Sequence, residues 1–207
     1  MSNPVPLQHD TIYHIYNRGN DGADLFIEER NYRYFLQLTI RHVHPVVETY
    51  AYCLLRNHFH LLIKVKSENE VPKPPSQYLS HPFNAYAKAI NKAYGRTGAL
   101  FERPFQRVAV TNEAYFARLV TYIHFNPVRH GFVDHPGEWL FSSYDALCST
   151  RPTRLQRDVV LDWFGDREGF VSGHADVDED VDLSGLEDLT GLERRQSYDG
   201  HATRAGE

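Results

Sequence analysis

Apolar and polar side chains alternate in several stretches of the chain, which is the pattern of β-strands. Residues 11–19 (TIYHIYNRG) interleave β-branched and aromatic residues before an Asn-Arg-Gly turn. Residues 46–55 and 58–65 are apolar runs separated only by Arg-Asn, which predicts two strands with a tight connection. Residues 105–110 are also strand-like. The pattern therefore predicts four strands.

Three other segments repeat their apolar residues at a spacing near that of a helix. These are residues 28–43, residues 83–95, which end at a glycine, and residues 111–131. The prolines of residues 71–77 indicate a loop before the second helix. The order strand, helix, strand, strand, helix, strand predicts an α+β, ferredoxin-like fold, in which helices pack on an antiparallel sheet and the helix over 111–131 is an addition.

Two histidines lie one residue apart in the apolar run LLRNHFHLLIKV. Alternate side chains of a strand point to the same face, so His58 and His60 project side by side. The opposite row, which includes Phe59 and Leu61, indicates the core face, and we expect the histidine row to look outward. Two imidazoles on a rigid strand can converge on a metal ion, although a pair on a solvated face would have the same spacing.

The helix expected over residues 111–131 carries a second candidate pair. Tyr122 and Asn126 are four residues apart, so their side chains are neighbours on one helical face. Pro127 disfavours helical geometry at the residue before it, which predicts a kink or a helix end just after the pair. Without the histidines, Tyr122 would be interpreted as an ordinary core aromatic of an amphipathic helix.

Charge divides the 207-residue chain into two parts. Residues 1–157 carry 18 Lys and Arg against 13 Asp and Glu, whereas residues 158–207 carry 4 against 14. We therefore expect one domain over residues 1–157 and an acidic, less ordered tail over residues 158–207. A basic body with an acidic tail agrees with a nucleic-acid partner, although the excess of positive charge is modest.

Several classes of protein are not favoured. Cys53 and Cys148 lack a Cys-x-x-Cys spacing, so neither a disulfide framework nor a thiolate zinc site is predicted. The first ten residues do not resemble a signal peptide, and no apolar run reaches the roughly 20 residues that span a bilayer. We expect a cytoplasmic protein without a membrane partner.

Four motifs occur in order along roughly residues 11–147: YHIYNRG, LLRNHFHLLI, GRTGALFERPFQ and YIHFNPVRHG. Together with the His-Phe-His row and the Tyr122 and Asn126 pair, they resemble the REP-associated tyrosine transposases, members of the single-tyrosine HUH nucleases. In this superfamily U stands for a hydrophobic residue, which here is Phe59. The residues beyond about 147 do not share the resemblance.

The resemblance implies a role for each matching residue. His58, His60 and Asn126 would bind Mg²⁺ or Mn²⁺, and Tyr122 would attack the scissile phosphate to leave a 5′-phosphotyrosine link. The chain would then be a metal-dependent endonuclease and strand transferase, a transposase that acts on single-stranded or hairpin DNA such as REP-like palindromes. Relatives act as monomers or as homodimers.

The residues near the motifs include cations and aromatic side chains that suit DNA. Phe101 and Phe105 could stack on bases or belong to the core, and His14, His124 and His130 are expected to be hydrogen-bonded structural histidines. Solvation alone could also explain each cation, but together the cations would supply salt-dependent phosphate contacts. The candidate DNA-binding cations are Arg18, Arg56, Lys88, Lys92, Arg96, Arg103 and Arg107.

Two other functions remain possible at this point. The chain could be a domesticated, ferredoxin-like DNA-binding module that no longer catalyses a reaction, although the four site residues are all present. It could also be a zinc-binding hydrolase, but two histidines and an amide are a poor zinc set without a carboxylate or a third histidine.

Overall fold

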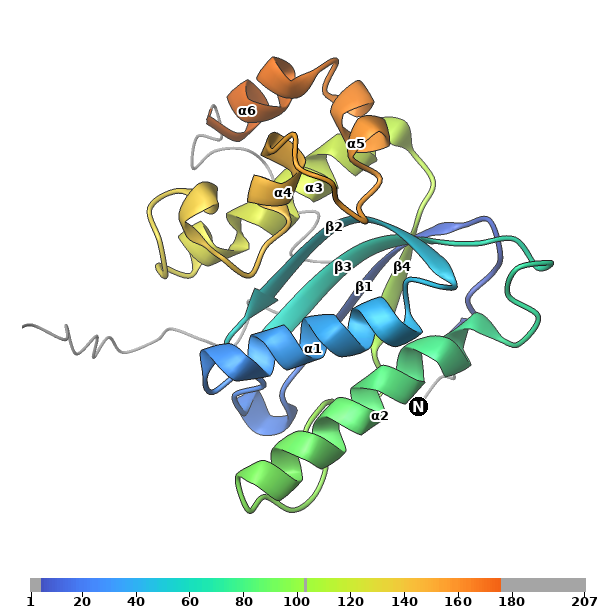
Figure 1. The fold of residues 1–207 in the computed structure, drawn as a ribbon, viewed down its shortest axis with the longest axis vertical. Coiled ribbons are helices and arrows are strands. Elements are labelled where there is room, and N and C mark those ends of the chain that lie inside the picture. Colours follow the sequence, from blue (N-terminus) through green and yellow to red (C-terminus); the bar gives the residue numbers. More distant parts are fainter. Residues whose placement is uncertain (1–4, 103, 176–207) are drawn as a thin grey trace, which may run out of the picture.

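A computed structural model describes residues 5–102 and 104–175 of the chain. Four strands form one antiparallel sheet with the spatial order β2-β3-β1-β4, and six helices pack around it (Figure 1). The elements are β1 (Ile12–Arg18), α1 (Glu29–His42), β2 (Val47–Leu55), β3 (His58–Val65), α2 (Pro75–Ala93), β4 (Gln106–Val110), α3 (Glu113–Arg129), α4 (Tyr144–Cys148), α5 (Arg157–Trp163) and α6 (Arg167–Ala175), with short 3-10 turns η1 (Asn20–Gly22) and η2 (Pro136–Glu138).

The expected ferredoxin-like fold is confirmed. From β1 to β4 the elements follow the predicted order, and the central strands of the sheet are β3 and β1. Helices α1 and α2 cover one face, whereas α3 to α6 lie on the other (Figure 1). The sheet is therefore covered on both faces, and each face has its own hydrophobic core.

Strand β3 divides its side chains between these two cores. Phe59 and Leu61 belong to the core under α1 and α2, while Leu62 belongs to the core under α3. His58 and His60 share the face of Leu62, and they are only 6% and 0% exposed. The expectation that they look outward was wrong, because the helices that follow β4 form a second layer over this face.

Two helix boundaries differ from the sequence pattern. Helix α2 begins at Pro75, inside the expected loop, because proline fits the first turn of a helix, where no N–H partner is needed. Helix α3 continues through Pro127 to Arg129, so the alternative of a helix end just after Asn126 is wrong, and a kink there stays a prediction. None of the helices in the described part of the chain is long and apolar enough to cross a membrane.

The folded part of the chain extends beyond residue 157. Val160 of α5 and Phe170 of α6 are fully buried in the core that α3 shares with the sheet. The division into a domain over 1–157 and a tail over 158–207 stays a prediction, since residues 176–207 of that tail lie outside the described residues.

A buried polar network joins α6 to α3 and to β2. His174 Nδ1 donates to the carbonyl oxygen of Phe170 at 2.7 Å, and its Nε2 lies 2.9 Å from His124 Nδ1. His124 Nε2 in turn lies 2.7 Å from Ser143 Oγ, which accepts a hydrogen bond from the Tyr52 backbone N–H. If both imidazole rings are neutral, each hydrogen bond in this network has one donor and one acceptor, so all of its polar atoms can be satisfied. His124 is thus the hydrogen-bonded structural histidine that the sequence suggested.

We expect the last described helix to contribute strongly to stability. Phe170→Ala should lower the free energy of unfolding by about 3–5 kcal/mol, because it leaves a cavity in a fully buried site. Val171→Ala in the same helix, at a side chain that is 42% exposed, should change it by less than about 1 kcal/mol. Denaturant unfolding followed by circular dichroism measures both, and equal effects would mean that α6 is not part of the cooperative fold.

Candidate active site

Strand pairing and helix packing bring the candidate residues together on the α3 face of the sheet. Tyr16 of β1 lies opposite His60 and Arg18 opposite His58 in the antiparallel register. The ring of Tyr122 on α3 lies edge-on to His60, with 5.6 Å between ring centroids. The structure therefore places the predicted nucleophile directly against the predicted histidine pair.

Each of the two histidines has one ring nitrogen bonded and one bare. His58 Nδ1 lies 2.8 Å from Asn57 Oδ1, and His60 Nδ1 lies 2.9 Å from Nε2 of His14 on β1. The Nε2 atoms of both His58 and His60 are buried and have no hydrogen-bond partner. An unsatisfied buried polar atom is costly, so two of them side by side indicate a site for a ligand.

Asn126 lies against both histidines from the helix. Its Nδ2 donates to the carbonyl oxygen of Tyr122 at 2.8 Å, which fixes the orientation of the amide. A weak hydrogen-bonding interaction of the amide with His58 and His60 partly offsets the lowering of their pKa values, although no hydrogen bond of standard length and angle reaches either Nε2. Tyr122 and Asn126 are thus neighbours on one helical face, as their spacing predicts. Because Nδ2 is used by the carbonyl of Tyr122, the oxygen is the amide atom available to interact with the histidines.

Burial keeps these histidines neutral. It lowers the pKa of His14 and of His58 to about 3, with the nearby charge of His130 adding to the effect on His58. The pKa of His60 is lowered well below its ordinary value for the same main reason, burial. A neutral imidazole has a lone pair for a metal ion, whereas a protonated one does not.

The same burial predicts acid sensitivity in metal-free buffer. The folded pKa values of about 3 for His14 and His58 and about 4 for His174 lie below the ordinary 6.5, so the unfolded chain binds more protons between these values. Stability is therefore complete above about pH 6.5 and falls with decreasing pH, by about 1.4 kcal/mol per pH unit for each such histidine.

Denaturant unfolding in EDTA at pH 7 and pH 5 measures this effect. The free energy of unfolding should be lower at pH 5, and His174→Gln should reduce the difference, because one of the depressed groups is removed. Equal stability at the two pH values would contradict the neutral, buried state of these rings.

Tyr122 is itself enclosed. Its side chain is only 1% exposed and belongs to the core between the sheet and α3. The Arg129 guanidinium lies over its ring at 5.8 Å from the centroid, and His14 lies edge-on at 6.4 Å. The tyrosine thus has both a histidine side and a cationic side, but a large substrate can reach it only if neighbouring groups move.

The donor set suits a metal ion only if the amide contributes. Within residues 5–102 and 104–175, no group of three or more His, Cys, Asp or Glu side chains is arranged to hold a metal. The bare Nε2 atoms of His58 and His60 supply two nitrogen ligands, and Asn126 is the neighbouring oxygen donor. Imidazole and amide oxygen fit Mn²⁺, and also Mg²⁺ with several retained waters.

The predicted DNA-binding cations in the described residues come from different elements of the fold. Arg18 is close enough for its charge to act on His58, but it pairs with Glu102 at 2.7 Å. Arg56 pairs with Asp24 near the turn between β2 and β3. Arg103 lies outside the described residues. The remaining cations are Lys88 and Lys92, exposed on α2, Arg96 just after α2, and Arg107 on β4.

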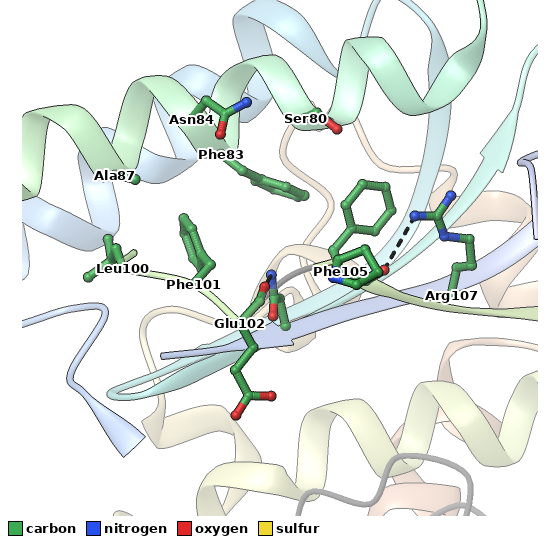
Figure 2. Close-up of a pocket in the computed structure, with 11 residues that line it drawn as sticks. Ser80, Phe83, Asn84, Ala87, Leu100, Phe101, Glu102, Phe105 and Arg107 are labelled. Carbon is green, nitrogen blue, oxygen red and sulfur yellow. Dashed lines mark hydrogen bonds between the residues drawn. The ribbon is translucent and has the colours of Figure 1, made fainter. Parts of the chain in front are cut away.

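Phe101 and Phe105 belong to the core on the opposite face of the sheet from Tyr122. They are 6% and 7% exposed, yet with Phe83 they line an open pocket of about 490 Å³ beside α2 (Figure 2). Arg107 lies over the Phe105 ring, 4.2 Å from its centroid. Core packing is thus observed for both rings, and base stacking stays a prediction.

Three residues near the site were not identified as functional from the sequence. His14 is hydrogen-bonded, as expected, but its partner is His60 itself. The ring of His130 lies 5.1 Å from that of His58, and Arg129 lies over Tyr122. The available signal was helical spacing, because His130 follows Asn126 by four residues, the same interval that separates Asn126 from Tyr122.

No family model matches the chain, but two curated proteins and a solved structure are similar to it. A protein of Escherichia coli K12 named REP-associated tyrosine transposase is 26% identical over 161 residues, which cover 68% of this chain and 89% of that protein. A Haemophilus influenzae protein assigned the same name is 27% identical over 107 residues, 49% of this chain and 61% of that protein. The solved structure is that of a REP-associated tyrosine transposase bound to a REP hairpin. It has a TM-score of 0.52 at 19% identity, covers 70% of this chain and 83% of that chain, and supports the fold.

Proposed function

We propose that the chain, which is similar to REP-associated tyrosine transposases, is a metal-dependent endonuclease and strand transferase for single-stranded or hairpin DNA. One observation carries the proposal. The ring of Tyr122 lies against His60, whose ring centroid is 5.2 Å from that of His58, and the Nε2 atoms of both histidines are buried without a hydrogen-bond partner. A tyrosine beside a cation site can cleave a phosphodiester without a water nucleophile, because the side chain attacks phosphorus and the cation stabilises the charge that develops on the phosphate.

In the proposed reaction, the Tyr122 oxygen forms a bond to phosphorus while the bond from phosphorus to the 3′ oxygen breaks. The tyrosine gives up its proton, and the leaving 3′ oxygen takes up a proton to become a hydroxyl. The downstream strand stays attached through a 5′-phosphotyrosine link, which conserves the bond for transfer to another 3′ hydroxyl. No nucleotide cofactor is then needed for rejoining.

His58, His60 and Asn126 would hold Mg²⁺ or Mn²⁺ beside the tyrosine. When bound, the ion supplies a positive charge that polarises the scissile phosphate. The chain's own groups bring the reacting atoms together: α3 carries Tyr122 and Asn126, and β3 carries both histidines. Because these two elements share a packed core, the tyrosine and the histidines are held at a constant separation.

Hairpin DNA is the favoured substrate class for two reasons. The related solved transposase is bound to a REP hairpin. In addition, the enclosed Tyr122 is reached more easily by the flexible backbone of a single strand, as at the foot of a hairpin, than by a stiff duplex. Arg18 is the predicted DNA-binding cation whose charge acts on His58, and it would need to leave Glu102 to contact a phosphate.

The burial of Tyr122 favours one second candidate. At 1% exposure the hydroxyl is enclosed, as it would be in a module that binds DNA and no longer cleaves it. The two functions differ in their products. A transferase joins the downstream, 3′-labelled fragment of one hairpin substrate to the 3′ hydroxyl of a second oligonucleotide in Mn²⁺ without ATP. A binding module retards the hairpin in a native gel and leaves it intact.

A further inference from the structure

We propose that His14 is a positioning residue that determines which nitrogen of His60 carries the proton. In this proposal, which rests on the proposed metal-dependent function, His14 Nε2 accepts a hydrogen bond from His60 Nδ1. The proton of His60 is then held at Nδ1, and its Nε2 keeps a lone pair aimed at the cation site. His14 would thus act on the metal through His60 without touching it.

The geometry between the two rings requires a choice of proton position. His14 Nε2 and His60 Nδ1 are 2.9 Å apart, and both side chains are buried, at 1% and 0% exposure. A hydrogen bond between two neutral imidazoles contains a single hydrogen, so one ring donates and the other accepts. If His14 donated, the hydrogen of His60 would be on Nε2, where it would block a metal ion.

The hydrogen bond of His58 indicates which proton position to expect in His60. Asn57 Oδ1 can only accept a hydrogen bond, so His58 Nδ1, at 2.8 Å, must be the donor. The Nε2 of His58 is consequently unprotonated, and it is buried without a partner. His60 Nε2 is also buried without a partner. It matches the unprotonated Nε2 of His58 only if His60 Nδ1 is the donor in its own hydrogen bond. His14 is the residue in position to accept from it.

The sheet holds His14 in this position independently of α3. His14 pairs with Leu62 and Tyr16 pairs with His60 in the β1 and β3 register, so His14 and His60 are diagonal neighbours on one face. Their ring centroids are 5.1 Å apart and the ring planes are 22° apart, so the rings lie edge to edge and nearly coplanar, as a hydrogen bond between ring nitrogens requires. Partners of this kind that orient metal ligands commonly change metal affinity about 10- to 100-fold when they are removed.

Two measurements on the full-length chain test the proposal. Long-range proton–nitrogen correlation spectra of the metal-free protein distinguish the two neutral forms of each histidine ring, with signals assigned through His60→Ala and His14→Gln. Isothermal titration calorimetry with MnCl₂ then measures affinity in the parent, His14→Gln and His14→Leu. Glutamine retains an oxygen that can accept from His60 Nδ1, whereas leucine retains only bulk.

The proposal predicts the Nδ1-protonated form for His60 in the parent and in His14→Gln. In His14→Leu we expect this preference to be lost and Mn²⁺ affinity to fall about 10-fold or more, with rescue in His14→Gln. A parent protein with His60 protonated at Nε2 would overturn the proposal, as would equal Mn²⁺ affinity in all three proteins. The spectrum of the parent needs no substitution, so the outcome does not depend on whether His14→Leu folds.

The same measurements distinguish failure of the metal-dependent function from failure of the proposed role of His14. If the parent binds no Mn²⁺ and His58→Ala gives the same titration, the metal-dependent function fails, whichever nitrogen of His60 carries the proton. If the parent binds Mn²⁺ through His58 while His60 is protonated at Nε2, the function stands and the role of His14 is rejected.

Discussion

Tyr122→Phe is expected to abolish covalent attachment of the protein to DNA while leaving the fold intact. Phenylalanine keeps the ring that packs against His60 and beneath Arg129, so the core around α3 should not change. Only the hydroxyl that forms the bond to phosphorus is removed. Loss of a covalent nucleophile lowers turnover by at least about 1,000-fold, so no adduct should be visible on a denaturing gel.

A matched control lies on the same helix. Tyr115 is seven residues before Tyr122 on α3 and lies near Tyr16, but the described ring contacts of His58 and His60 do not include it. Tyr115→Phe should therefore form adduct at close to the parent rate, and a hairpin mobility shift should be similar for both variants. An adduct that persists in Tyr122→Phe would assign the nucleophile to another residue.

His58→Ala and His60→Ala are expected to have the next largest effect. Each removes one of the two bare Nε2 atoms, so Mn²⁺ binding should weaken at least about 100-fold and adduct formation should fall in parallel. EDTA should stop the parent enzyme, and added Mn²⁺ should restore it. Calorimetry with MnCl₂ and a time course of adduct formation measure the two quantities separately.

A histidine far from the site provides the comparison for this pair. His81 is exposed on α2, the helix on the opposite face of the sheet, and His81→Ala should leave both quantities unchanged. If His58→Ala bound Mn²⁺ as tightly as the parent, the histidine pair would not be the metal site. Circular dichroism spectra of the variants separate loss of a ligand from loss of the fold.

The order of strands and helices was predictable from residue periodicity, but the second layer was not. The apolar row of Phe59 and Leu61 correctly indicated one core face. The row of His58 and His60 looked like a solvated face because its alternation is that of a half-buried strand. It is buried because α3 packs over it, and periodicity within one strand contains no information about segments that follow 50 or more residues later.

The candidate site was predictable only as far as local spacing allows. Tyr122 and Asn126 share a helical face because of their separation, and the structure places them against the histidines, as the resemblance to known nucleases implies. The bond from His14 to His60 was not predictable, because it depends on the register between β1 and β3. The continuation of α3 through Pro127 depends on tertiary packing, which outweighs the local preference of the residue before proline.

The most direct test of the central claim is a denaturing gel of the protein incubated with Mn²⁺ and hairpin DNA labelled at either the 5′ or the 3′ end. A 5′-phosphotyrosine link attaches the protein to the downstream fragment, so the account predicts an adduct that carries the 3′ label and is absent in Tyr122→Phe. Hairpins that are bound but never cleaved or attached, over a panel of REP-like sequences, would contradict the proposed chemistry and favour a DNA-binding module.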